Sequence, residues 1–446
     1  MERSHGRALI AAAILVWVAA AGIRWAASSP LGHDEARYAL SGLALAEGHL
    51  PRWDYVPPGV AALAVPGTLA SPNEHGAAPV RPSERALRFV PLLANLGFLL
   101  AAFAVARRFS RETAAWTLAV LAGTLPVVRL SCDLLSDLPS VALVLGGLAL
   151  LLAERITWRI VLVAPMFALA FYVRYGSCVP IAIIGAAIAA TRWRELLARP
   201  WPAVATVVLF AVLLVPHVLM SRAIDGSALG ILHASAAMPA PGRGLADYAI
   251  RPFWIYGILG PPLVIAAIAG ARRDRRRALL VVIALAQIVV LGLQTQAQPR
   301  YVFVATVLLV IAGVDTLRAQ LADHARRTQL ARIAAGIVAV TWIAALVSAV
   351  RSKHALAIEA APTLAAARAI RADAAGKPCV VIGRHRMQLE WYSGCEAAMF
   401  APQPLPRFYA VRDAAPGPDQ PDLTAQPGHH VVVLHTPEVD AIRCDP

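Results

Sequence analysis

The stretch SSPLGHDEARYALSGLALAEGHLPRWDYVPPGVAALAVP, residues 28–66, decides how the rest of the chain is organised. It follows one apolar segment and precedes many others, so it is the first stretch predicted to lie outside a bilayer. Asp34 and Glu35 stand side by side at the start of a short predicted helix that Gly48 ends, and Pro57-Pro58 starts another. Carboxylates just beyond a membrane surface suit a membrane enzyme better than a transporter or a scaffold.

The composition places the chain among multi-spanning membrane proteins. Of its 446 residues, 58% are hydrophobic and only 15% are charged, which lies outside the range of soluble globular domains. The net charge of +14 could indicate nucleic-acid binding, but most basic residues are arginines clustered at the ends of apolar segments. Membrane lipids are therefore the expected partners, and nucleic acid is not. The five cysteines form no CxxC or Cys/His cluster with metal-site spacing.

Eleven apolar segments are predicted to cross the membrane: 8–27, 87–105, 113–130, 138–153, 160–172, 179–190, 203–220, 253–271, 278–293, 301–314 and 334–350. The first resembles a secretory signal but is long enough to span, so we expect it to stay uncleaved. An N-terminus on the cytoplasmic side puts the arginine clusters in the inner loops, which predicts an N-in, C-out topology. Residues 59–70 are too short to span and are predicted to be re-entrant or interfacial.

Residues 351–446 are predicted to form a soluble outer domain behind the transmembrane domain of residues 1–350. A helix is expected at 355–375, with short strands at CVVIG, WYSGC and HHVVVLH. Cys379, Cys395 and Cys444 all lie in this domain, on the side where disulfides can persist. A Cys379–Cys395 bridge and three free thiols both remain open, because spacing alone does not give connectivity.

Two pairs of outer carboxylates are candidates for chemistry. Asp34 and Glu35 could simply be acids favoured by a helix N-terminus. The amphipathic helix behind them, however, suits a reaction between a lipid-borne donor and a polar acceptor at the interface. Asp137 and Asp133 belong to the second outer turn, SCDLLSD. Carboxylates at membrane depth are costly and usually functional, so Asp137 at the mouth of a span is the stronger candidate, and Asp133 is predicted to be a solvated turn residue.

Several arginines break the inside bias of positive charge and fall on the outer side: Arg81, Arg85, Arg88, Arg174 and Arg300. Any one of them could contact a lipid headgroup or pair with an acid. Together they indicate an anionic ligand. A phosphate is the natural match, because guanidinium binds it bidentately and stays charged.

The string HDEARYALSGLALAEGHLPRWDYVPP resembles the first outer loop of the polyprenyl-phosphate-dependent GT-C glycosyltransferases. These include the protein O-mannosyltransferases of glycosyltransferase family 39, the lipid A aminoarabinose transferases and the Rgt-type transferases. The shared positions are Asp34, Glu35, Tyr38, Gly48 and Pro57-Pro58, and Asp137 matches the acid of the second outer loop. FYVRYGSCVPI and QPRYVFVATVLLVIAG resemble later family segments, the second with Arg300-Tyr301 at the head of a span.

One position departs from the family pattern. Many members carry a Lys directly before the Pro-Pro pair that contacts the donor phosphate, and here that position is Val56. Either Arg81, Arg85 or Arg300 takes this role, or the chain is less active or differently specific.

The resemblance implies an all-α polytopic membrane protein of the GT-C type with a small α/β outer domain at the C-terminus. It implies an inverting glycosyltransferase that moves a sugar from a polyprenyl-phosphate donor to a hydroxyl of a glycan, lipid or protein acceptor, on the outer face of the inner membrane. A lipid monophosphate donor presents no diphosphate for a metal to mask, so we expect no metal and no other cofactor.

In this hypothesis Asp34 is the general base, Glu35 orients the acceptor or supports Asp34, and Asp137 positions the acceptor or the base. The predicted substrate-binding residues are Tyr38, Tyr55, Arg81, Arg85, Arg174, Arg300 and Tyr301, with Arg85 and Arg300 neutralising the leaving phosphate. Two other functions stay open. A transporter or lipid flippase would carry ionisable residues in mid-span and repeated halves, neither of which is evident. A non-catalytic envelope scaffold is kept open by Val56.

Overall fold

The structure is a computed structural model, and it describes residues 2–27, 29–49, 56–69, 81–236, 244–251, 257–294, 298–322, 327–383, 385–398, 408–413, 430–435 and 439–445. The chain forms two compact units. The first comprises residues 1–24, 53–60 and 91–350, and the second comprises residues 25–52, 61–90 and 351–446. The second unit thus combines the C-terminal tail with most of the opening loop and the start of the fourth helix.

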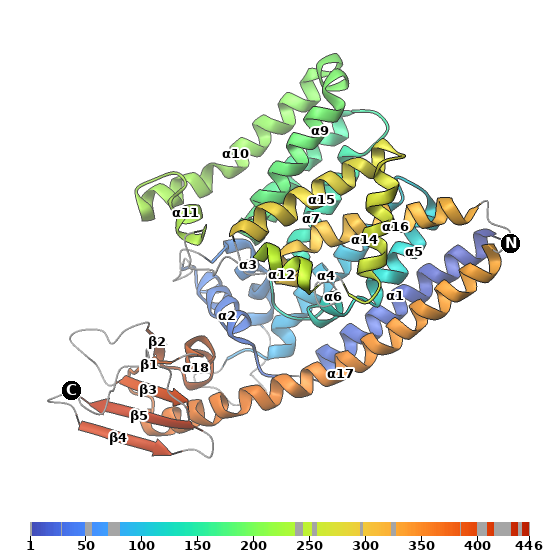
Figure 1. Ribbon diagram of the computed structural model, residues 1–446. Coiled ribbons are helices and arrows are strands. Elements are labelled where there is room, and N and C mark those ends of the chain that lie inside the picture. The colour runs from blue at the N-terminus through green and yellow to red at the C-terminus, as the bar shows by residue number, and fades with distance from the viewer. Residues whose placement is uncertain are drawn as a thin grey trace. The chain divides into compact units, whose positions relative to one another are not determined.

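Helices dominate the first part of the chain (Figure 1). Their bounds are α1 Glu2–Ala26, α2 His33–Ala46, α3 Pro58–Thr68, α4 Glu84–Ala106, α5 Arg111–Ala122, α6 Leu125–Arg129, α7 Asp137–Leu151, α8 Val163–Val173, α9 Cys178–Ala198, α10 Pro200–Asp225, α11 Gly230–Ala236, α12 Gly244–Ile250, α14 Gly260–Ala271, α15 Arg275–Gln294, α16 Phe303–Ala322, α17 Arg327–Ala374 and α18 Arg386–Ser393. Three short 3-10 helices precede spans: η1 Trp158–Leu162, η2 Tyr175–Ser177 and η3 Pro299–Val302.

Within the described residues, seven helices are long and apolar enough to cross a membrane, and three apolar helices are shorter. They coincide with ten of the predicted spans. The eleventh, 113–130, is divided into α5 and α6. The all-helical multi-pass architecture is therefore confirmed, while the number of crossings and their orientation stay predictions.

Helix α16 lies at the centre of the first unit, and α10 presents its side chains to the surroundings. In α16, 83% of the most apolar window is buried, against 6% in α10. The exposed residues of α10 include Val207, Val212 and Leu219. Such a large apolar surface is unfavourable in water, so lipid is the expected surrounding of α10.

The opening loop folds as its sequence predicts. Helix α2 begins at His33, so Asp34 and Glu35 occupy its first turn, and the chain turns at Gly48 with a φ of +82°. Pro58 starts α3, which at 11 residues is too short to span. A Cβ on Gly42 would come within 2.6 Å of Ala64 Cβ, so a glycine is what lets α2 approach α3 closely.

The tail is α/β, as predicted, but its elements differ in two ways. Helix α17 has 48 residues and continues from the last predicted span without a break into the predicted tail helix (Figure 1, orange). The predicted strand at WYSGC is wrong, because Trp391–Ser393 form the last turn of α18.

A five-stranded sheet completes the second unit. Its strands are β1 Val380–Ile382, β2 Glu396–Ala397, β3 Phe408–Asp413, β4 His430–His435 and β5 Val439–Asp445, in the order β2-β1-β3-β5-β4. β1 is parallel to β2 and β3, and β5 is antiparallel to β3 and β4. The strands expected at CVVIG and HHVVVLH are confirmed, and β2, β3 and β5 were not predicted.

Candidate active site

Glu35 is buried and fully engaged. Its carboxylate accepts from Arg88 Nε at 2.8 Å and from Arg88 Nη2 at 2.7 Å, and also from the Gly32 amide at 2.9 Å. Arg88 is 0% exposed and also donates to the carbonyls of Ser29 at 2.6 Å and Pro30 at 3.1 Å. A buried charge is stable only with such a complete set of partners. Glu35 and Arg88 together therefore fix the turn that leads into α2.

Asp34, next to Glu35, is accessible. Its side chain is 32% exposed, and the guanidinium of Arg37 lies 3.8 Å away, one turn further along α2. Of the two acids in this turn, Asp34 is thus the one whose carboxylate can reach a substrate.

The side chain of His33, next to Asp34, is a neutral imidazole. Burial is the main cause and the charge of Arg37 the second, and together they lower the pKa of His33 to about 4. Arg37 Nη2 lies 3.1 Å from His33 Nε2. Because a guanidinium only donates, His33 Nε2 is the acceptor, and Arg37 is held between His33 and Asp34.

A second cluster forms in the first unit around Asp137, the first residue of α7, which is 1% exposed. Its Oδ1 accepts a hydrogen bond from Arg174 Nη1, and its Oδ2 lies 4.0 Å from Arg300 Nη1. Arg174 occupies the break between α8 and η2, and Arg300 belongs to η3. Three distant segments, each at the start of a helix, therefore bring two cations to one buried carboxylate.

Tyr301 completes this cluster. The guanidinium carbons of Arg174 and Arg300 lie 5.0 and 5.5 Å from the centroid of its ring, within cation–π range. Asp137, Arg174, Arg300 and Tyr301, four residues singled out separately in the sequence, are thus brought together. The three charged side chains carry a net charge of +1, so the group can hold an anion.

The other predicted residues have different surroundings. Arg81 stacks over Trp391 at 5.3 Å, and burial lowers the pKa of its guanidinium. Arg85 donates to the Ala26 carbonyl at 2.9 Å. Val56 is 3% exposed. Tyr38 is half-buried on α2, and Tyr55 lies outside the described residues.

The prediction for Asp133 is wrong, because this residue is buried and paired instead of solvated. Arg24, at the end of α1, donates from Nη2 to both of its carboxylate oxygens at 3.0 Å. Arg24 is 1% exposed. The turn just before Asp133 is also held by a side chain, because Asn95 Nδ2 donates to the backbone carbonyls of Leu130 and Ser131.

Sequence reasoning named Arg88 but gave it no place in the site. Its position inside an apolar span was the available signal, because a charge there must be paired. Lys353, which is 2% exposed and donates to Ser29 Oγ at 3.0 Å, gave no comparable signal within its long helix. Among the described residues, no group of three or more His, Cys, Asp or Glu could hold a metal ion.

Comparison with known proteins identifies the fold. Residues 80–220 match the family described as dolichyl-phosphate-mannose-protein mannosyltransferase. The structure resembles ArnT from Cupriavidus metallidurans bound to undecaprenyl phosphate, with a TM-score of 0.67 and 17% identity over 98% of this chain and 97% of that chain. This chain has the GT-C fold. The resemblance predicted from the opening loop is thereby confirmed, although the family match begins after that loop.

A second GT-C protein is more distant. AglB, the oligosaccharyltransferase of Archaeoglobus fulgidus in complex with an inhibitory peptide and a dolichol-phosphate, matches with a TM-score of 0.51 and 12% identity. The match covers 89% of this chain and 64% of AglB. No curated protein matches in sequence. What this chain shares with ArnT and AglB is therefore the fold.

Proposed function

We propose that this protein is a membrane glycosyltransferase that moves a sugar from a polyprenyl-phosphate donor to the hydroxyl of a glycan, lipid or protein acceptor. The GT-C fold and the match to a mannosyltransferase family support transferase activity. ArnT was solved with undecaprenyl phosphate and AglB with a dolichol-phosphate, which supports a lipid-phosphate donor.

The observation that carries the proposal is the convergence of Arg174 and Arg300 on Asp137. A phosphate is negatively charged, and the group of Asp137, Arg174 and Arg300 carries a net charge of +1. Guanidinium groups also bind phosphate oxygens through paired N–H donors. Side-chain exposures of 22% and 24% leave both arginines accessible while Asp137 holds them. Asp137 is thus a positioning residue for the two cations. They neutralise the negative charge that develops on the phosphate as the sugar leaves.

Asp34 acts as the general base. In the reaction, the carboxylate takes the proton of the acceptor hydroxyl, and the acceptor oxygen attacks the anomeric carbon of the sugar. The bond from this carbon to the phosphate oxygen breaks, and the polyprenyl phosphate leaves with the electron pair. Direct displacement inverts the anomeric centre, as the family resemblance implies. Glu35, whose oxygens are occupied by Arg88 and Gly32, positions Asp34 and does not touch the substrate.

The reaction takes place on the outer face of the inner membrane. The arginine clusters of the predicted inner loops support this orientation. The disulfide between Cys379 and Cys395 supports it independently, because such bonds persist on the oxidising side of a membrane.

Mass comparison of envelope glycolipids, glycans and proteins from source cells with and without the gene tests the function. We expect one class of molecule to lose a sugar mass without the gene and to regain it with the wild-type gene. Asp34→Asn should fail to restore it. Asp225→Asn, the same change at an exposed acid at the end of α10, should restore it fully. Full restoration by a stably inserted Asp34→Asn variant would refute the assignment of the base.

A further inference from the structure

The turn before α2 has its backbone groups held by side chains. Arg88 binds the carbonyls of Ser29 and Pro30, and Glu35 accepts from the Gly32 amide. Leu31, which is 0% exposed, lies between them. Buried backbone groups need partners, so the N–H and C=O of Leu31 decide whether this turn is fully ordered.

Both groups of Leu31 are bound by α18 of the C-terminal domain. The Leu31 amide donates to the Tyr392 hydroxyl at 2.8 Å, and Gln388 Nε2 donates to the Leu31 carbonyl at 2.8 Å. The Tyr392 hydroxyl in turn donates to Glu84 Oε1 at 3.2 Å. Gln388 and Tyr392 are four residues apart on one face of a helix, so they act as a two-point clamp on the backbone of a single residue, Leu31.

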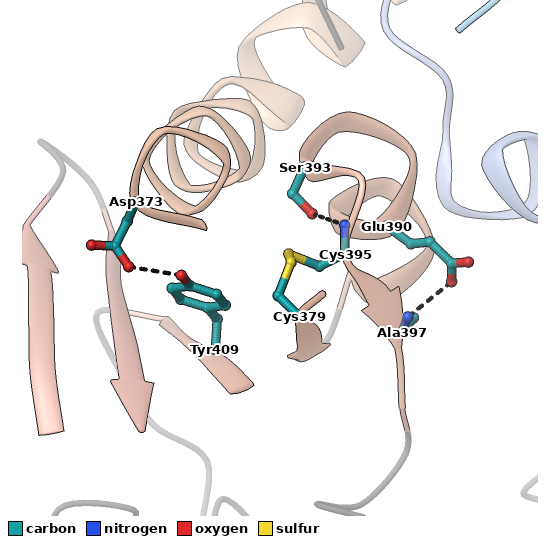
Figure 2. The surroundings of a disulfide bond; sticks show 7 residues. All are labelled: Asp373, Cys379, Glu390, Ser393, Cys395, Ala397 and Tyr409. Atoms are coloured by element: carbon teal, nitrogen blue, oxygen red, sulfur yellow. Dashed lines mark hydrogen bonds between the residues drawn. A yellow bond between two sulfur atoms is a disulfide. The ribbon is translucent and has the colours of Figure 1, made fainter. Parts of the chain in front are cut away.

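The clamp helix is fastened to the sheet beyond its C-terminal end. Cys379, directly before β1, is joined by a disulfide to Cys395, two residues after α18 (Figure 2). Glu390 of α18 also accepts from the amide of Ala397 in β2 at 3.0 Å. The segment that carries Gln388 and Tyr392 is therefore a closed loop with little freedom to shift.

We propose that α18 is a positioning element for the transfer reaction, in which Gln388 and Tyr392 hold Leu31 and thereby place Asp34 three residues further along. The disulfide keeps this clamp in register. The inference rests on the proposed role of Asp34 as base. It gives the C-terminal domain a part in catalysis without any contact between its own side chains and the reacting atoms.

A matched pair of variants tests the clamp. Tyr392→Phe removes the hydroxyl bonded to Leu31 and Glu84. Tyr409→Phe removes the hydroxyl of another buried tyrosine of the same domain, which donates to Asp373 Oδ2 at 2.7 Å (Figure 2). We expect Tyr392→Phe to lower kcat for transfer roughly tenfold or more with little change in KM for the lipid donor, because small misplacements of reacting groups slow catalysis strongly. Tyr409→Phe should leave both unchanged.

Hydrogen exchange of residues 29–37 provides a readout that does not depend on activity. Tyr392→Phe, Gln388→Leu and the paired Cys379→Ser/Cys395→Ser change should all speed exchange of the Leu31 amide, and Tyr409→Phe should not. Equal exchange and equal kcat in Tyr392→Phe and wild type would overturn the clamp, as would faster exchange with an unchanged kcat. If the wild type transfers no sugar, the proposed function fails, and exchange alone still decides whether α18 orders this turn.

Discussion

Replacing Arg88 by Met should open the turn before α2. The four hydrogen bonds described above for Arg88 would be lost, two of them to the Glu35 carboxylate. The bond from the Gly32 amide to Glu35 would remain. Removing one member of a buried ion pair costs about 3–5 kcal/mol, because the other charge remains buried without compensation. We therefore expect the free energy of local opening of residues 29–46 to fall by about 4 kcal/mol, which corresponds to roughly 10³-fold faster amide exchange.

Hydrogen exchange of the purified protein measures this change, and two further variants calibrate it. Arg85→Met, one turn earlier in α4, removes the hydrogen bond to the Ala26 carbonyl and should cost only about 1 kcal/mol. The double variant Glu35→Gln/Arg88→Met no longer buries an unpaired charge, so its exchange should be slower than that of Arg88→Met alone. The reasoning is refuted if Arg88→Met and Arg85→Met exchange equally fast, or if the double variant exchanges faster than both.

Three further outcomes are expected. Arg174→Met should weaken binding of undecaprenyl phosphate in detergent by roughly 10- to 100-fold, because one charge-assisted contact contributes about 1.5–3 kcal/mol. Arg272→Met, at an exposed position, should leave the affinity unchanged. Calorimetry measures both affinities, and equal values would contradict the phosphate site. Asp133→Asn should destabilise the first unit by about 3 kcal/mol, because Arg24 stays buried without its charge partner; an unchanged Tm would contradict this. Between pH 6.5 and the lowered His33 pKa of about 4, the unfolded state binds more protons than the folded state, so the stability of the protein should fall as the pH drops through this window. In His33→Gln the Tm should fall less steeply over the same range. Parallel Tm profiles of variant and wild type would show that His33 does not contribute.

The sequence predicted those parts of the fold whose signals are local. The length of the apolar segments predicts the spans. Gly48 predicts where α2 ends, and Pro58 predicts where α3 begins. The error at WYSGC has a physical cause. WYSGC covers only the last turn of α18 and the two residues after it, a segment too short to show the period that distinguishes a helix from a strand. Aromatic residues beside a cysteine then favoured the strand.

The site was predictable by residue type and only partly by pairing. Acids and arginines on the outer side were visible as exceptions to the composition of the spans. Which acid meets which arginine depends on long-range packing, since Glu35 and Arg88 are 53 residues apart, and Asp133 and Arg24 are 109 apart. A local pattern does not encode such pairs, which is why Asp133 was expected in solvent and Arg88 had no role.

The departure from the family pattern at Val56 bears on where the phosphate charge is met. Val56 is 3% exposed and apolar, so its position supplies neither a charge nor a hydrogen-bond donor from a side chain. Arg174 and Arg300 supply two guanidinium groups instead, and Asp137 with the Tyr301 ring holds both in place. A guanidinium stays protonated in any surroundings and binds oxygens in pairs, whereas a lysine contributes one compact charge. We therefore propose that arginine replaces the family's lysine, and of the three arginines considered for this role we propose Arg300.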